Sequence, residues 1–490
     1  MSSPKVAKPP DATSSGLHAG ESLLRPEEHV LSTLEADGSR RWLFPKLAAG
    51  YFWNRRRYLS YFLIGVFAII PHLRMNGKPL VLLDITARRF TILGYTFLPT
   101  DTLLLALLMV CAFTTIFFAT ALMGRIWCGW GCPQTVFMEF VFRPIDRLFQ
   151  GTAGKGGTPK DKIHGWKWFA RIGVYLLLAM FMTHTFLAYF VGVDRLAVWV
   201  RQSPFEHPVP FIVMIVTVGL MMFDFLYFRE QTCLIVCPYG RFQSVMLDRR
   251  SLIVSYDHVR GEPRGKATKK QAEETSIPSG DCVDCGNCVR VCPTGIDIRN
   301  GLQMECIHCT QCIDACDAVM VKLQRPQGLI RYSNQDAIER KPSAILRARL
   351  LIYPIVLLAG ISAFTYIFLS KKDFDAKLYR NLGNSFSIGE SGLIDNSLRL
   401  SLTNRTDNKH SYQMKILTPD GGTVRSIESE LVELDPQEHR VVPILISVPF
   451  EKFDDARCQV QFHIRDDQGE ERTIKYMVLG PYQLPKKDAP

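Results

Sequence analysis

Apolar residues are distributed very unevenly along this chain. Five stretches of about 20 residues are predominantly apolar, and they run over 52–73, 102–123, 168–192, 209–228 and 346–369. Each is close to the length that a helix needs to cross the hydrocarbon core of a bilayer. The pattern predicts an integral membrane protein with an α-helical bundle of about five spans. The first span is the weakest, because Pro71 and His72 interrupt its end.

The C-terminal part of the chain has a different period. Apolar and polar residues alternate in short runs, over 397–403, 412–417, 440–448, 458–464 and 473–479. Turn-forming residues separate these runs, as at Pro419–Gly422 and Asp466–Gly469. Alternation with a period of two is typical of strands with one buried face. Several such strands, in a region that begins at about residue 385, predict an immunoglobulin-like β-sandwich.

Basic residues concentrate between alternate spans. The segments 1–57, 124–167 and 229–343 hold 32 Lys and Arg, whereas 74–101 and 193–208 hold 6. Because basic residues gather on the cytoplasmic side of membrane proteins, the first three segments are expected in the cytoplasm. An odd number of spans then places the C-terminal domain in the periplasm of an inner-membrane protein. The net charge of +11 has this explanation, and no basic-aromatic stripe indicates nucleic-acid binding.

The chain is therefore expected to have five parts. These are a disordered cytoplasmic tail (1–45), a four-span membrane domain (46–245), a cytoplasmic segment with an inserted ferredoxin-like domain (246–343, core 275–325), the fifth span (344–370) and the periplasmic sandwich (371–490). Pro, Ser, Ala and charged residues dominate the first part, a composition that is typical of disorder.

Eight of the 14 cysteines form two runs with the spacing Cys-x2-Cys-x2-Cys-x3-Cys. Three close-spaced thiolates wrap one corner of an iron–sulfur cubane, and in two-cluster ferredoxins the fourth ligand comes from the other run. We therefore assign one [4Fe–4S] cluster to Cys282, Cys285, Cys288 and Cys316, and a second to Cys306, Cys309, Cys312 and Cys292. Zinc also accepts four thiolates, but two tandem runs of this spacing favour iron–sulfur clusters. His308 lies between two of these cysteines.

Two further motifs share the pattern Cys-x3-Cys-Pro, at Cys128–Pro133 and Cys233–Pro238. Each follows an apolar span, and both are expected at the same membrane face. In a helix the spacing would place both thiols on one side, and each proline would end the preceding helix or open the next. The four thiols could bind a soft metal such as Cu(I), hold a further iron–sulfur cluster, or form redox-active dithiols. We rank soft-metal binding first, and simple packing is the alternative. The residues are Cys128, Cys132, Cys233 and Cys237.

Three polar residues within or at the end of spans are further candidates: His72, His184 and Asp224. Polar groups in lipid usually face the bundle interior and mark function. A paired structural role is an equal alternative for them.

The order of these modules resembles the FixG/RdxA/CcoG family, over about residues 50–485. Its members are accessory proteins of cbb-type cytochrome oxidases. The resemblance implies a cupric reductase that supplies Cu(I) during oxidase assembly, with copper near the four Cys-x3-Cys-Pro thiols. It implies oxidase subunits or copper-delivery proteins as partners, and a cytosolic electron donor. The membrane and ferredoxin parts are also similar to the quinol-oxidising NapH and NosR type, so a quinol-linked carrier is an alternative. A third is a non-enzymatic assembly scaffold.

Overall fold

The computed structural model describes most of the chain. The described residues are 32–34, 39–159, 163–265, 280–342, 348–381, 383–389, 392–426 and 431–482. They fall into two compact units, one made of residues 1–96 and 109–359 and the other of 97–108 and 360–490.

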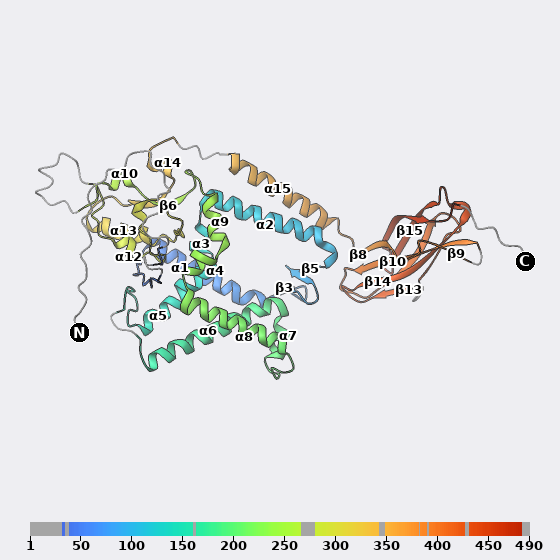
Figure 1. The fold of residues 1–490 in the computed structure, drawn as a ribbon, viewed down its shortest axis with the longest axis horizontal. Helices are drawn as coiled ribbons and strands as arrows, with labels where there is room; N and C mark the ends of the chain where they lie inside the picture. The colour runs from blue at the N-terminus through green and yellow to red at the C-terminus, as the bar shows by residue number, and fades with distance from the viewer. Residues whose placement is uncertain are drawn as a thin grey trace, which may run out of the picture. The chain divides into compact units, whose positions relative to one another are not determined.

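Four helices are long and apolar enough to cross a membrane (Figure 1). They are α2 (Thr102–Met123), α6 (Trp166–Val191), α8 with its π-helical continuation η4 (Pro208–Phe228), and α15 (Ala348–Leu369). Most of their apolar surface is not covered by the described part of the chain, as expected for helices that face lipid. These bounds match four of the five spans predicted from the sequence.

The first predicted span is also a helix, α1 (Tyr51–Ile69). It is not among the four, because three arginines at 55–57 occupy its first two turns. That end donates a hydrogen bond to the segment that follows α2. Near the other end, Phe67 O accepts a hydrogen bond of 2.8 Å from the Tyr189 hydroxyl at the end of α6. The 19 residues of α1 extend about 28 Å at 1.5 Å each, close to the thickness of the hydrocarbon core. The bundle thus has about five membrane helices.

Short strands occupy the segment between α1 and α2, which the sequence analysis treated only as a loop. The strands are β1 (Arg74–Met75), β2 (Lys78–Pro79), β3 (Val81–Asp84), β4 (Arg89–Ile92) and β5 (Tyr95–Phe97). Strands β3, β4 and β5 form one small sheet, and β1 pairs with β2.

The segments after α2 and α8 are broken into short helical pieces. After α2 come α3 (Ile126–Trp130), α4 (Pro133–Phe137), the π-helix η3 (Met138–Phe142) and α5 (Arg143–Phe149). Helix α7 (Val193–Trp199) lies between α6 and α8, and η5 (Thr232–Val236) and α9 (Pro238–Met246) follow α8.

The ferredoxin-like domain includes a two-stranded antiparallel sheet, which joins β6 (Ile253–Tyr256), before the cysteine runs, to β7 (Ile330–Ser333), after them. It is therefore larger than the core of 275–325 expected from the cysteines. Its helices are α10 (His258–Gly261), α12 (Asn287–Arg290), η6 (Ile298–Asn300), α13 (Gln311–Lys322) and α14 (Gln335–Ile338). Apolar residues of both strands pack with several of the cysteines in one core.

The expected disordered tail over 1–45 lies largely outside the described residues. Within the described part, residues 39–47 lie against the ferredoxin-like domain and the loop after α5. The Lys46 N–H donates to Arg290 O at 2.8 Å, and the Leu47 N–H donates to Lys155 O at 2.9 Å. The packed part of the chain thus begins before α1.

The C-terminal unit contains a β-sandwich, as predicted. One sheet has the order β12–β14–β10–β8 with β9 added to β10, and the other has the order β13–β11–β15–β16. Every recorded pairing within them is antiparallel. The strands are β8 (Phe374–Arg380), β9 (Ser387–Ile388), β10 (Leu393–Asn404), β11 (His410–Thr418), β12 (Thr423–Ser426), β13 (Leu431–Leu434), β14 (His439–Pro449), β15 (Arg457–Asp466) and β16 (Glu471–Leu479).

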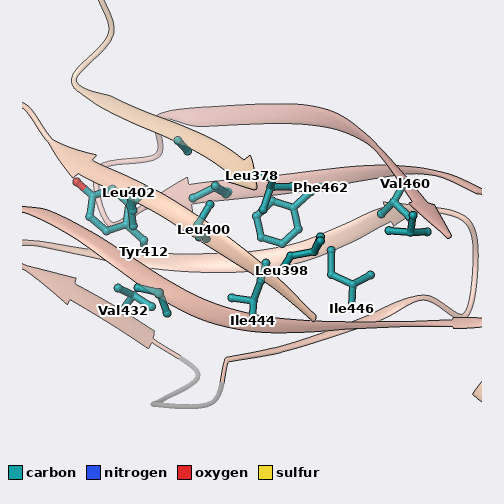
Figure 2. Packing of buried hydrophobic residues seen from close by; sticks show 14 of the residues in the cluster. Leu378, Leu398, Leu400, Leu402, Tyr412, Val432, Ile444, Ile446, Val460 and Phe462 are labelled. Atoms are coloured by element: carbon teal, nitrogen blue, oxygen red, sulfur yellow. The ribbon is translucent and has the colours of Figure 1, made fainter. Parts of the chain in front are cut away.

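The core of the sandwich lies between the two sheets (Figure 2). Leu398 and Leu400 of β10 and Ile444 of β14 meet Val460 and Phe462 of β15, and all are fully buried. The five alternating runs seen in the sequence fall within β10, β11, β14, β15 and β16, and these predictions are confirmed. Strand β8 begins at Phe374, before the start expected near residue 385.

We expect Phe462→Ala to destabilise the sandwich by about 3–5 kcal/mol, because a large buried ring is lost and the cavity cannot fully close. Hydrogen exchange of the β14 and β15 amides in the full chain measures this loss. The control is Leu417→Ala, at a side chain that is 49% exposed, which should change the free energy of unfolding by less than about 1 kcal/mol. Equal effects of the two substitutions would contradict the assigned core.

Candidate metal centres

The two cysteine runs follow the same backbone path. In each run, the residues just before and just after the second cysteine have positive φ. They are Asp284 (50°) and Gly286 (64°) in the first run, and His308 (52°) and Thr310 (64°) in the second. Because residues other than glycine rarely adopt this conformation, its repetition at equivalent positions indicates one shared loop geometry. Each run then leads into a helix, α12 or α13.

Thiols from both runs line a first cavity. Cys282, Cys285 and Cys288 come from the first run, and Cys316 comes from α13. Cys282 and Cys288 are buried, whereas Cys285 is exposed. The structure thus brings together the four residues that the sequence analysis assigned to one cluster.

A second cavity is lined by the other set: Cys306, Cys309, Cys312 and Cys292. Cys306 and Cys309 are buried. Cys288 lines this cavity as well as the first, so the two thiol sets are direct neighbours.

The spacing of the thiols distinguishes a cluster from a single ion. Four thiolates around one zinc ion, each about 2.3 Å from it, lie within roughly 4 Å of one another. In the described residues, the only group of three candidate ligand atoms within 4.8 Å of one another is His410, Asp466 and Asp467 of the sandwich. No three cysteine sulfurs are grouped this closely among the described residues, and the crossed sets of four thiols match the ligand pattern of two [4Fe–4S] clusters.

Burial controls the protonation of these thiols. It raises the pKa of Cys306 to about 12 and that of Cys288 to about 11. Both thiols are thus protonated at neutral pH when no metal is bound, and iron must displace the protons.

The two Cys-x3-Cys-Pro motifs are built alike. Cys128 lies in α3 and Cys233 in η5, whereas Cys132 and Cys237 are the N-cap residues of α4 and α9. In both motifs the proline is the first residue of the following helix, where its missing N–H costs nothing. The two thiols of a motif therefore do not share one continuous helix, which was one of the possibilities raised by their spacing.

Thiols of both motifs, here called the membrane-edge thiols, act on the pKa of Cys128 and on that of Cys233. The pKa of Cys128 is raised to about 12, first by burial and then by Cys132 and Cys237, while Arg125 opposes the rise. The pKa of Cys233 is raised by burial and by the thiols of Cys132, Cys128 and Cys237. The structure thus gathers the two motifs into one group. The Cys128 thiol also donates to Gln243 Oε1 at 3.1 Å, and Gln243 is fully buried.

The first of these motifs packs directly on the second cysteine run. A Cβ added to Gly129 would lie 2.5 Å from Ile307 O and 2.9 Å from His308 O. Only glycine fits this approach without displacement. Arg56 of α1 bridges the two loops, because its guanidinium donates to Gly129 O at 2.9 Å and to Cys309 O at 2.8 Å. The sequence analysis did not single out Gly129 or Arg56.

A second arginine, Arg125, also links these loops. Its guanidinium donates to Cys306 O at 3.4 Å and to the main-chain oxygen of Gly240, in the first turn of α9. Its main-chain N–H donates to Nδ1 of His308 at 3.1 Å. His308 is 1% exposed, and its Nε2 has no hydrogen-bond partner among the described residues. His308 is thus a buried junction residue.

The polar residues in the spans do not form one centre. His72 is exposed at the end of η1 (Ile70–His72), and Nδ1 of His184 bonds to Met180 O of its own helix at 2.8 Å. Asp224 accepts a hydrogen bond from Thr232, the residue before Cys233. Of the three, Asp224 alone contacts a residue next to a candidate thiol in the described structure.

Comparison with known families agrees with this architecture. A model described as a 4Fe-4S dicluster domain matches residues 228–335, and one described as a 4Fe-4S binding domain matches residues 105–152. A model of the Ig-like fold at the C-terminus of FixG matches residues 364–481. The protein is a membrane-bound iron–sulfur protein of the electron-transport class.

Three curated relatives identify the family more closely. It is 31% identical to protein RdxA of Cereibacter sphaeroides over 76% of this chain and 82% of that protein. It is 32% identical to protein RdxB of the same organism, over 79% and 84% of the two chains. It is 37% identical to the nitrogen fixation protein FixG of Rhizobium meliloti over 60% of this chain, and the match spans only 57% of FixG. The chain belongs to the FixG/RdxA family.

The crossed assignment of the fourth ligands makes a direct prediction. Cys316→Ser is expected to disturb the same cluster as Cys282→Ser, and Cys292→Ser the same cluster as Cys306→Ser, because each pair lines one cavity. Each substitution should lower the bound iron by about half, since one of two cubanes loses a ligand. Iron analysis and EPR of the reduced protein measure this.

The matched control is Cys458→Ser, at a buried thiol in the core of the sandwich, which should keep all the iron. If Cys316→Ser and Cys306→Ser instead removed the same EPR signal, each run would supply all four ligands of its own cluster and the crossed assignment would be wrong.

Proposed function

We propose that the protein is a cupric reductase that supplies Cu(I) for the assembly of a cbb-type cytochrome oxidase. The observation that carries this proposal is the contact between the second cysteine run and the membrane-edge thiols. Gly129, between Cys128 and Cys132, packs on the main chain of Ile307 and His308. A redox-active centre and a group of soft ligands are thereby held next to each other.

A third cavity supports the same pairing. Cys233 lines it together with Thr294 and Ile307, and these two residues also line the cavity of the second cluster. Both Cys-x3-Cys-Pro motifs are thus adjacent to the second thiol set, which we assign as ligands of one [4Fe–4S] cluster. When bound, the clusters supply single electrons, and reduction of Cu(II) to Cu(I) takes one.

In this proposal Cys128, Cys132, Cys233 and Cys237 bind copper as a substrate. Thiolates are soft ligands that favour Cu(I) over Cu(II), so they stabilise the product. No three of the described cysteine sulfurs lie within 4.8 Å of one another, so a copper ion held without movement of the chain contacts fewer than three of them. A low number of ligands suits a metal that must be passed on.

The charge pattern supports an orientation for this reaction. We propose that the ferredoxin-like domain and the membrane-edge thiols face the cytoplasm, with the sandwich in the periplasm, since Lys and Arg concentrate in the segments assigned to the cytoplasm. In this orientation a cytosolic reductant can deliver electrons at the exposed Cys285. The sandwich can then bind oxidase subunits or copper-delivery proteins in the periplasm.

Replacing the four membrane-edge cysteines by serine should abolish most of the copper reduction and leave both clusters in place. The full-length protein is reduced under anaerobic conditions, freed of reductant and mixed with Cu(II), and a chelator dye reports Cu(I). Cys111→Ser, a thiol within α2, is the control and should behave as the parent. If the serine variant reduces copper at the parental rate, these thiols are not the site. Clusters that do not cycle at all would favour the scaffold alternative.

Gly129→Val tests the contact itself. Its side chain would collide with the Ile307 and His308 carbonyls, so the two loops must move apart, and copper reduction by pre-reduced protein should slow while the iron content stays constant. Gly219→Val is the control, because a side chain there has no neighbour within 4 Å. An unchanged rate in Gly129→Val, with displacement of the loop verified by hydrogen exchange, would argue against transfer across this contact.

A further inference from the structure

A separate cavity that is partly open to solvent lies at the membrane edge, between α5 and the extended segment 43–45. Three arginines line it, Arg143, Arg147 and Arg229, together with Asp146 and Gln150. None of these residues takes part in the proposed copper chemistry.

Among the described residues, arginines outnumber carboxylates around this cavity. The group contains five arginines and three carboxylates. Glu230 pairs with Arg40 and Arg143, and Asp146 pairs with Arg171 and Arg229. The third carboxylate, Glu139, pairs with Arg143.

Arg147 is the fifth arginine of this group. Its side chain forms no ion pair or hydrogen bond in the part of the chain that the structure describes, although it lines the cavity. Among the described residues, the five arginines thus exceed the three carboxylates by two charges. An excess of this kind is stable when an anion binds.

Two guanidinium donors at the cavity lack a hydrogen-bond acceptor. The Nε atoms of Arg143 and Arg229 have no hydrogen-bond partner among the described residues, although Nε of Arg229 lies 3.9 Å from Glu230 Oε2. Both atoms are closed off from solvent, so a ligand in the cavity reaches them only when these side chains move. The two residues are only 3% and 5% exposed. Buried N–H groups of charged side chains normally find an acceptor, and a phosphate group offers several oxygens to guanidinium groups.

The depth of the cavity indicates where such an anion comes from. Arg229 follows the last residue of the span that ends at Phe228, and Arg171 lies in the second turn of the span that begins at Trp166. Trp166 and Trp168 are exposed at the same end of α6, and tryptophans gather at the level of the lipid headgroups. Basic pockets at this level bind anionic headgroups.

We propose that Arg143, Arg147 and Arg229 form a binding site for a phosphate oxyanion, supplied by the headgroup of an anionic phospholipid. This site goes beyond the proposed copper reduction and does not depend on it. It is nevertheless connected to the ferredoxin-like domain, because Arg143 donates to Pro293 O at 3.2 Å, directly after Cys292. A bound headgroup would thus lie beside an arginine that also contacts the second cysteine set.

The test uses the full-length protein in nanodiscs that contain phosphatidylglycerol in phosphatidylcholine, or phosphatidylcholine alone. Native mass spectrometry counts the phosphatidylglycerol that stays bound after release from the disc. We expect the parent protein to retain it and Arg147→Gln to bind it about tenfold more weakly, the loss expected for one charge-assisted contact. Inorganic phosphate is added in a second arm to ask whether the free anion competes.

The matched control is Arg201→Gln, which removes the same charge from an exposed position between α7 and α8 and should retain the lipid like the parent. Unchanged iron content verifies that each variant is folded. Binding of phosphate alone, without phosphatidylglycerol, would keep the site but assign the free anion as its ligand. Equal retention by parent, Arg147→Gln and Arg201→Gln, with no effect of phosphate, would overturn the proposal.

Discussion

Two buried positive charges set the constraint on which the first unit depends. Arg56 is 1% exposed and Arg125 is 5% exposed, and neither forms an ion pair with a carboxylate in the described residues. Their hydrogen bonds go to main-chain oxygens of both thiol-bearing loops. An unpaired buried charge is costly. Arg125 lies beside Cys128 and Cys306 and also near Glu305, and Arg56 lies near Cys309 and Asp314. The thiols add negative charge beside both arginines when they ionise, which happens when they bind metal. Assembly of the membrane bundle and filling of its metal sites are therefore coupled.

The same contacts give the two halves of the ferredoxin-like domain different surroundings. The second cysteine run packs against Gly129 and is bonded by Arg56 and Arg125, whereas the first run has Cys285 at the surface. A nearly symmetric pair of loops is thus used asymmetrically. The two membrane-edge motifs show a comparable duplication, since each consists of a span, a short helical turn and a helix opened by proline. The protein joins two internally repeated units through one specific contact.

Much of this organisation was predictable from the sequence, because it rests on local patterns. The length of the apolar stretches predicted the spans, and the alternation of polar and apolar residues predicted five strands of the sandwich. The spacing of the cysteines predicted the two sets of thiols that line the two cavities. The roles of Arg56 and Arg125 were not predictable, because carbonyl acceptors have no signature in the sequence and both residues resemble ordinary basic flanks of a span. Gly129 was read as part of a motif, although its lack of a side chain is required by a loop some 180 residues away. The strands between α1 and α2 are short and irregular, so their alternation is too brief to detect.

The exposure of Cys285 determines where oxidative damage to this protein begins. Oxidants and chelators reach the first thiol set through an uncovered ligand, while Cys306 and Cys309 of the second are shielded. Solvent access largely determines which cysteines are attacked. Damage therefore starts at the first thiol set and reaches the second, which packs on the segment after α2, only later. A partly degraded molecule would still hold the metal site of the second set but would have lost that of the first.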